Sequence, residues 1–326
     1  MVRSNVFAAV AALSLSSAVL GVPFAPRPQE AQTQLPDPSD FTSPLAFDPA
    51  VVAAFKANKL GDAAADDDSE EASGPEIINM SLAGLQGSNF TDFAPSGLGP
   101  AEQPSKRSII GPDNRVLWTN REYPYSAMGR IQRSDGAVCS GALIGARHVV
   151  TARHCIPPEG QNVAIRFQPA YDQGETLGGY DVERIFRPDY GQEGWCANAY
   201  DWAIFILREE AGRKNGWLGL KVVNPDTQLN RAMFFHYGYP GDKGANRPYR
   251  MEGISASSAT GCDRGSPVVT NTDSAGGQSG GPLWLLENGS RYVYGVHVGS
   301  APGFSVTAGG PSLLEGYGNV LRDYPN

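Results

Sequence analysis

The sequence predicts an all-β fold, a sandwich or a barrel, for the region that follows residue 107. Short apolar runs recur there, mostly four to eight residues long, and Gly, Pro, Asp or Asn separates them. The 39 glycines and 25 prolines also indicate a chain that turns often. The spacing does not favour alternating strands and helices. The predicted strands are Ser126–Ile131, Ala142–Ile144, Val149–Thr151, Val163–Phe167, Ala203–Leu207, Met233–Tyr239, Pro267–Thr270, Leu283–Leu286 and Tyr292–Val298.

One short helix is expected at the C-terminus, over Leu313–Asp323, although it contains two glycines. At the opposite end, Arg3 precedes an apolar run that closes on the small-residue sequence Val19-Leu20-Gly21. This layout predicts a signal peptide over 1–21 and a secreted, extracellular protein. The run is too short and too rich in Ser and Ala for a membrane span, so no membrane association is expected.

Composition changes near residue 107, which divides the chain. Residues 22–107 hold Pro clusters and an acidic run from Asp66 to Glu71, and they predict a poorly structured acidic pro-segment. The segment ends in Lys106-Arg107, a dibasic processing site, and the domain is expected to span 108–326. Residues 1–107 contain 6 Lys/Arg and 13 Asp/Glu, against 20 and 21 in the remainder. The domain is therefore nearly neutral, which argues against a nucleic-acid partner.

The four cysteines form an even set, and export would permit two disulfides with three possible pairings. Three sequons, at Asn79, Asn89 and Asn288, predict a glycoprotein in a eukaryotic secretory pathway.

Three segments carry the chemistry. They are Cys139-Ser-Gly-Ala-Leu-Ile-Gly-Ala-Arg-His-Val-Val-Thr-Ala-Arg-His154-Cys155, Tyr200-Asp201-Trp202-Ala203-Ile204 and Gly276-Gly277-Gln278-Ser279-Gly280-Gly281-Pro282. A serine hydroxyl needs a base to take its proton, and His154 suits that role. Asp201 would fix the imidazole tautomer and stabilise the imidazolium. The N–H groups of Gly277 and Ser279 are the natural oxyanion hole.

Other chemistries fit less well. Gly277 to Gly281 also matches G-x-S-x-G, the nucleophile elbow of α/β-hydrolases. That fold needs an acid and then a histidine after the serine, with further βα units, and only 47 residues follow Ser279. No second His or Cys lies at metal-ligand spacing from His154, and no phosphate-binding loop motif occurs. We therefore expect no metal and no cofactor.

These residues resemble the chymotrypsin-like serine proteases over roughly 108–326. Thr151-Ala152-Arg153-His154-Cys155 is similar to that family's histidine segment, and Gly277 to Pro282 is similar to its serine segment. The resemblance implies two six-stranded antiparallel β-barrels and a triad of His154, Asp201 and Ser279. It also implies the disulfide Cys139–Cys155, which leaves Cys196–Cys262.

One position departs from the family. Gln278 stands where trypsin-like members have an aspartate that pairs with the new N-terminal amine after zymogen cleavage. An amide cannot form that ion pair, so activation must work differently here.

The glutamyl-endopeptidase (V8-like) branch is the more similar one. It is suggested by Ser108-Ile-Ile-Gly-Pro-Asp113, Gly238-Tyr-Pro-Gly-Asp-Lys243, Asp273-Ser-Ala-Gly-Gly-Gln-Ser279 and Tyr294-Gly-Val-His297. In that branch, the positions of His297 and Ser274 bind the carboxylate of the substrate's P1 residue, and we place Gly299 in the same set. The implied activity is a zymogen endopeptidase that cleaves after Glu or Asp.

Two alternatives stay open at the sequence level. Asp273 lies six residues before Ser279, where trypsin-like enzymes bind P1 Arg or Lys, so it could direct basic specificity. A protease-like binding protein without catalysis is the other. The expected partners are a protein or peptide substrate, the chain's own pro-segment and an activating dibasic-specific protease, and we expect a monomer.

Overall fold

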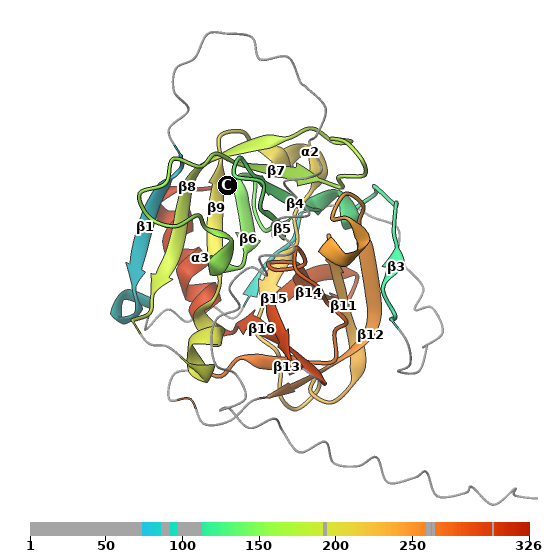
Figure 1. Cartoon of the computed structure of the whole chain (residues 1–326). Helices are drawn as coiled ribbons and strands as arrows, with labels where there is room; N and C mark the ends of the chain where they lie inside the picture. The colour runs from blue at the N-terminus through green and yellow to red at the C-terminus, as the bar shows by residue number, and fades with distance from the viewer. Residues whose placement is uncertain are drawn as a thin grey trace, which may run out of the picture. The chain divides into compact units, whose positions relative to one another are not determined.

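Two closed barrels of antiparallel strands make up most of the described chain (Figure 1). The computed structural model describes residues 74–85, 92–96, 113–191, 194–258, 262, 265–301 and 303–326. In the first barrel the strand order is β8-β7-β4-β5-β6-β9, and pairing of β8 with β9 closes it. Its strands are β4 (Met128–Arg133), β5 (Val138–Leu143), β6 (His148–Thr151), β7 (Ile165–Pro169), β8 (Tyr180–Asp189) and β9 (Ala203–Leu207).

The second barrel has the order β14-β11-β12-β13-β16-β15 and closes through the pairing of β14 with β15. Its strands are β11 (Ala232–Gly238), β12 (Tyr249–Ser258), β13 (Val268–Thr270), β14 (Pro282–Glu287), β15 (Ser290–Ala301) and β16 (Phe304–Gly309). The predicted pair of six-stranded antiparallel barrels is thus confirmed. Each predicted apolar run overlaps one of these strands.

Large apolar side chains fill the barrels and the contact between them. Phe167 and Phe205 are fully buried in the first barrel, as is Phe234 in the second. Tyr125 belongs to the 3-10 turn η3 (Tyr125–Ala127), and its ring packs against Trp284 of β14 at a centroid distance of 6.1 Å. Burial of such side chains contributes roughly 1.5–3 kcal/mol each. This contact connects the entry to β4 with the second barrel.

The C-terminal helix is also confirmed. Helix α3 (Pro311–Asp323) begins two residues before the predicted start, with Pro311 in its first turn. The indole of Trp202 lies so close to Gly316 that a Cβ there would come within 2.2 Å of the ring. Tyr317 donates its hydroxyl to the carbonyl of Ile144, at 2.6 Å. The two glycines that weaken the helical pattern are therefore compatible with the helix, because one of them lets it pack closely on the first barrel.

Both disulfides expected from the family resemblance are present. Cys139 of β5 is bonded to Cys155, which ends the 3-10 turn η4 (Arg153–Cys155). Cys196 in η5 (Trp195–Tyr200) is bonded to Cys262. The remaining short elements of the domain are α2 (Ala211–Asn215), β10 (Gly219–Lys221), β3 (Val116–Leu117) and η6 (Gly241–Lys243).

Part of the predicted pro-segment is ordered against the barrels. Strand β1 (Glu76–Ser81) pairs in parallel with β8, and β2 (Asp92–Phe93) pairs with β10, which itself extends the second barrel along β15. Between them, η2 (Leu82–Leu85) places Leu85 in the main core at 3% exposure. Polar composition led us to expect little structure here, but Ile77, Ile78 and Met80 supply apolar contacts to the core.

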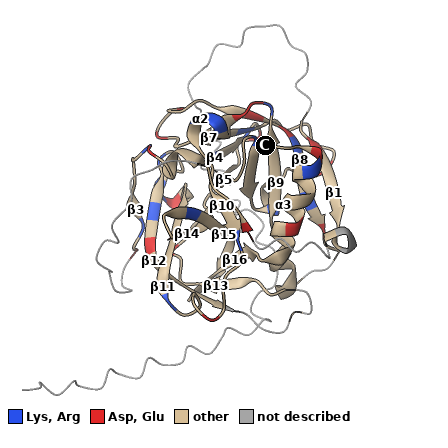
Figure 2. Ribbon diagram, turned by 180° about the vertical axis from the view of Figure 1, so that it is seen from behind, with Lys and Arg blue, Asp and Glu red and all other residues tan. Residues whose placement is uncertain are grey.

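The remaining sequence features are placed as follows. The signal segment 1–21, the pair Lys106-Arg107, the start Ser108 and the sequon Asn89 lie outside the described residues. Asn79 in β1 and Asn288 in the turn before β15 are exposed. Charged residues of both signs are interspersed along β8 and β12 (Figure 2). Among the described residues, no helix is long and apolar enough to cross a bilayer.

Candidate functional site

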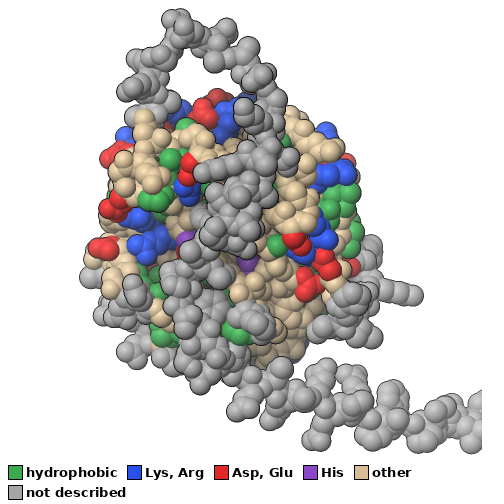
Figure 3. Space-filling model, in the orientation of Figure 1, with side chains coloured by type: hydrophobic (Ala, Val, Ile, Leu, Met, Phe, Trp, Pro, Cys, Tyr) green, Lys and Arg blue, Asp and Glu red, His purple; other side chains and the backbone are tan. Residues whose placement is uncertain are grey.

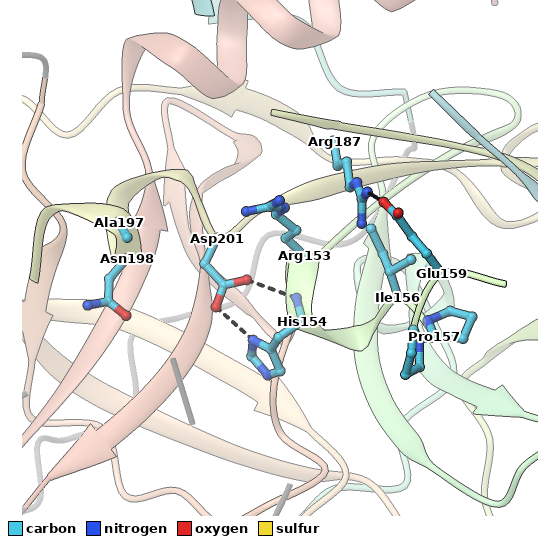
Figure 4. Close-up of a pocket in the computed structure, with 10 residues that line it drawn as sticks. Arg153, His154, Ile156, Pro157, Glu159, Arg187, Ala197, Asn198 and Asp201 are labelled. Carbon is cyan, nitrogen blue, oxygen red and sulfur yellow. Dashed lines mark hydrogen bonds and ion pairs between the residues drawn. The ribbon is translucent and has the colours of Figure 1, made fainter. Parts of the chain in front are cut away.

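His154 and Asp201 form a pair joined by two hydrogen bonds (Figure 4). Strands β6 and β9 pair antiparallel with Thr151 opposite Ala203, so η4 and the end of η5 meet at one end of the barrel. The Asp201 carboxylate contacts Nδ1 of His154 at 2.7 Å and accepts the backbone N–H of His154 at 2.9 Å. Two contacts from one carboxylate fix both the backbone and the ring of the histidine.

The electrostatics of this pair favour a protonated imidazole. Burial lowers the pKa of His154, but the charge of Asp201 and its hydrogen bond raise it, and the net pKa lies above the ordinary value of 6.5. The two side chains are 14% and 10% exposed. An imidazole that remains within reach of solvent and has a raised pKa is suited to accept a proton during a reaction.

A cavity of about 300 Å³ adjoins the pair. In the view of Figure 4, Arg153 lies between Asp201 and Arg187, and Arg187 forms an ion pair with Glu159. Histidine atoms are also visible near the middle of the molecular face in Figure 3. The cavity is lined by Arg153, His154, Ile156, Pro157, Pro158, Glu159, Arg187, Ala197, Asn198 and Asp201.

Ser279 lies in the loop before β14, which we call the serine loop (Gly276–Gly281). Gly277 has φ +96° and Gly280 has φ +81°, the left-handed region that favours glycine. A Cβ at Gly277 would meet the carbonyl of Tyr239 at 2.4 Å. Within the described part of the chain, the N–H groups of Gly277 and Ser279 donate to no acceptor. Both amides are thus available to an external oxygen atom.

Ser140 of β5 joins the serine loop to the first barrel. Its N–H donates to the carbonyl of Ser279 at 2.8 Å, and its hydroxyl donates to the carbonyl of Gly277 at 2.8 Å. The same hydroxyl accepts the N–H of Tyr239 at 3.0 Å. Because Ser140 neighbours Cys139, which is bonded to Cys155, the loop and His154 are tied to the same strand. The backbone of Ser279 and the segment that carries His154 are therefore both attached to β5, and only His154 and Asp201 of the three predicted triad residues are joined directly.

His297 of β15 adjoins the serine loop through its backbone. Its N–H donates to Gly281 and its carbonyl accepts from Gly280, at 2.9 and 2.7 Å. The imidazole is buried and makes no hydrogen bond to any described residue. Burial, His236 and His154 hold its pKa well below 6.5. His297 is therefore a neutral ring with an unused donor.

The other specificity candidates lie beside His297. The Ser274 hydroxyl is 3.4 Å from that of Ser305, which donates to Thr272. His297 lies opposite Thr307 in β16, and Ser305 is two residues away on the same face of that strand. Gly299 pairs with Val306 in the same ladder. The candidate substrate-binding residues therefore share one part of the second barrel.

The Asp273 carboxylate is turned toward the chain that enters the domain. It accepts the backbone N–H of Asn114 at 2.8 Å. This contact satisfies part of its hydrogen-bonding capacity. No group of three or more His, Cys, Asp or Glu in the described residues has the arrangement of a metal site.

Two residues of this neighbourhood were missed by the sequence analysis. Ser140 is a fully buried hydroxyl inside a strand, and Arg115 contacts Gln278 although 163 positions separate them. A polar residue beside a cysteine in an otherwise apolar strand was a signal for Ser140. Nothing local in the sequence marks Arg115.

Comparison with known proteins places this geometry in a family. Residues 117–310 match the trypsin family. The glutamyl endopeptidase of Bacillus licheniformis is 32% identical over 193 residues, and the match spans 57% of each chain. The extracellular metalloprotease of Bacillus subtilis is 27% identical over 218 residues, 60% of this chain and 67% of that one. The chain thus spans only a little over half of the first relative.

A solved structure agrees with the fold. The structure described as Glu endopeptidase in complex with MPD superposes with a TM-score of 0.54 at 22% identity, and covers 65% of this chain and 99% of that one. At this identity the likeness concerns the fold. Since the family match covers more than half of the sequence, the chain belongs to the trypsin family of serine proteases.

Proposed function

We propose that the chain is a secreted serine endopeptidase, made as a zymogen, that cleaves peptide bonds after Glu or Asp. The observation that carries the proposal is the His154–Asp201 pair, in which one carboxylate contacts both the ring and the backbone N–H of the histidine. Ser279 is the proposed nucleophile, because its carbonyl accepts the N–H of Ser140 in β5, and β5 is joined through Cys139 to Cys155 beside His154. The name of the glutamyl endopeptidase relative supports the specificity.

The reaction proceeds in two halves. His154 takes the proton of the Ser279 hydroxyl as its oxygen attacks the peptide carbonyl, and the imidazolium then gives that proton to the leaving amine. This leaves an acyl ester on Ser279. Water attacks the ester, again with His154 as base, and the serine regains its proton as the carboxylic acid departs. Asp201 stays ionised throughout and stabilises the imidazolium.

The developing negative charge needs donors at the reacting carbonyl oxygen. The N–H groups of Gly277 and Ser279 are assigned this role, because neither donates to an acceptor among the described residues. Loss of one such donor typically costs about 2.7–4 kcal/mol of transition-state stabilisation. The left-handed conformation of Gly277 supports the assignment, because it sets the direction of the peptide group that follows it.

The proposed specificity depends on His297 and Ser274. A P1 carboxylate would accept the N–H of His297, which bonds to no described residue, and the Ser274 hydroxyl, whose present contact with Ser305 is long at 3.4 Å. Gly299 would line the same subsite. The alternative, basic specificity through Asp273, is less well supported because that carboxylate accepts a backbone N–H from Asn114.

The activity and its specificity can be tested together on peptide libraries. We expect the mature enzyme to cleave after Glu and Asp, and Ser279→Ala to lower kcat by roughly 10⁶-fold. Cleavage confined to Arg and Lys would support the Asp273 alternative. Activity that survives Ser279→Ala would contradict the serine mechanism. A folded chain with no turnover of any library would favour the binding-protein alternative.

A variant of His297 gives a sharper test of the P1 assignment. His297→Leu should lower kcat/KM for Glu substrates by about 10- to 100-fold, the value of one hydrogen bond to a charged group. A substrate with P1 Leu serves as the control, and its kcat/KM should fall much less. Equal losses on both substrates would assign His297 to the core rather than to specificity.

Maturation completes the proposal. The signal peptide would end at Gly21, and a dibasic-specific protease would cut after Arg107 to release a monomeric domain of residues 108–326 from the pro-segment 22–107. Glycans are proposed on Asn79, Asn89 and Asn288. N-terminal sequencing of the secreted protein should read Ser108, and any other start would contradict this processing scheme.

A further inference from the structure

The side chain of Gln278 connects several parts of the serine loop. Gln278 is fully buried, and its Oε1 atom accepts the N–H of Ala275 at 2.9 Å within the loop. Its Nε2 atom donates to the carbonyl of Asp273 at 3.4 Å. Gly277 and Ser279, whose amides form the proposed oxyanion hole, are its immediate neighbours. The position of the Gln278 side-chain amide therefore controls the position of both backbone N–H donors.

A guanidinium holds that amide from outside the loop. Nη1 of Arg115 donates to Oε1 of Gln278 at 2.8 Å. The same group bonds Asp242 through both terminal nitrogens, at 3.0 and 2.6 Å, and Asp113 through Nε and Nη2, at 2.9 and 3.1 Å. All five N–H donors of the guanidinium are thus used. The Arg115 side chain is only 7% exposed.

The carboxylates around Arg115 fix it in place. Lys243 adds an ion pair with Asp113 at 2.8 Å, so two positive and two negative side chains balance. Arg115 and Lys243 hold the pKa of the Asp113 carboxyl well below its ordinary value. Asp242 lies in η6, whose Gly241 donates its N–H to Gly276 at 2.6 Å. Arg115 therefore reaches the serine loop by two routes.

We propose that Arg115 is a positioning residue that holds the serine loop in its reactive conformation. It would supply from within the chain the cation that the N-terminal amine supplies in trypsin-like relatives, where an aspartate replaces Gln278. A neutral amide suits this arrangement, because the two aspartates already balance the guanidinium and Lys243. The inference rests on the proposed peptidase function.

The proposal changes what cleavage after Arg107 would do. Arg115 contacts Gln278 in the uncut chain, eight residues beyond the processing site. The loop is therefore assembled without a new N-terminal amine. Cleavage after Arg107 would therefore not be needed to build the oxyanion hole.

The first experiment compares variants of the mature enzyme. Arg115→Gln should lower kcat by about 100-fold, as small displacements of reacting groups do, with little change in KM. Arg115→Lys should recover part of the loss. Gln278→Met removes the oxygen atom that accepts from Arg115 and keeps the ion pairs of Arg115. The double variant with Arg115→Gln should have a kcat no lower than that of the poorer single variant. Arg166→Gln is the control, because Arg166 also bonds two carboxylates but in the first barrel.

The second experiment needs no variant of the cluster. The mature enzyme with its N-terminal amine acetylated, or with a few residues added before Ser108, should keep the kcat of the free-amine form. Loss of activity on blocking the amine would overturn the proposal, as would full kcat in both Arg115→Gln and Gln278→Met. Ser279→Ala in the same assay distinguishes failure of the Arg115 proposal from failure of the peptidase function. Activity retained in Ser279→Ala would refute the peptidase function.

Discussion

Replacement of Ser140 by alanine tests how the two barrels hold the serine loop. The Ser140 hydroxyl accepts the N–H of Tyr239 and donates to the carbonyl of Gly277, and all of these groups are buried. Ser140→Ala leaves one backbone donor and one backbone acceptor without a partner. Each such group costs about 1–3 kcal/mol, so we expect the free energy of unfolding to fall by roughly 2–6 kcal/mol.

The same change should also reduce catalysis. Gly277 would lose the contact that fixes its carbonyl, and its N–H would shift with the peptide chain. We expect kcat to fall by about 10- to 100-fold, with KM less affected. Denaturant unfolding measures the stability change, and steady-state kinetics on one good substrate measures the second effect.

Ser126→Ala is the matched control for this prediction. Ser126 is also a buried serine, but its hydroxyl makes one hydrogen bond to a described residue, to the carbonyl of Asn215 at 2.6 Å, away from the serine loop. We expect a loss of about 1 kcal/mol and an unchanged kcat. If the two variants unfold alike and both keep full kcat, Ser140 does not position Gly277 and the reasoning fails.

The remaining predictions concern pH, backbone space and the pro-segment. The net pKa of His154 is raised and the base must be neutral, so kcat/KM should rise with pH through a midpoint above 6.5. Asp201→Asn should move that midpoint to lower pH and reduce kcat by about 10⁴-fold. An unmoved midpoint would contradict the assignment of Asp201. Gly280→Ala places a Cβ 2.0 Å from Thr151, whereas Gly303→Ala, also at positive φ, meets open space. Chemical denaturation should show that Gly280→Ala is destabilised by about 1–3 kcal/mol more than Gly303→Ala. Equal losses in the two variants would refute the clash. Leu85→Ala should lower the free energy of unfolding of the uncut chain by about 2–5 kcal/mol. A loss smaller than that of an exposed substitution would show that the segment around Leu85 is not part of the core.

Two of the strands that the sequence analysis missed, β8 and β12, share a physical cause. Strand β8 reads Tyr-Asp-Val-Glu-Arg-Ile-Phe-Arg-Pro-Asp, and its polar side chains interrupt the apolar runs on which the prediction depended. Strand β12 is similar, with Arg250 and Glu252 forming an ion pair on one side. One face of each strand packs inward while the other meets solvent or a neighbouring segment. Runs of apolar residues find strands that are buried on both faces, such as β9, and pass over these.

The residues of the site also divide into those that the sequence predicts and those that it does not. His154 and Asp201 lie in segments with distinctive neighbours, and their strands are adjacent in one barrel, so motif and chemistry sufficed to predict their association. Ser140 and Arg115 act on residues 137 and 163 positions away. Such contacts depend on how two barrels dock and on where one entering segment crosses them. No local pattern in the sequence carries that information.

This division indicates where the function is most easily lost. The His154–Asp201 pair is internal to the first barrel and would survive small movements between the barrels. The serine loop belongs to the second barrel, yet Ser140 of the first holds its Gly277 and Ser279 carbonyls. A change that loosens the contact between Tyr125 and Trp284 would therefore displace the proposed nucleophile and oxyanion donors from the base, while each barrel kept its own hydrogen-bonded strands. Activity should accordingly be lost at a lower denaturant concentration than the one at which the strands unfold.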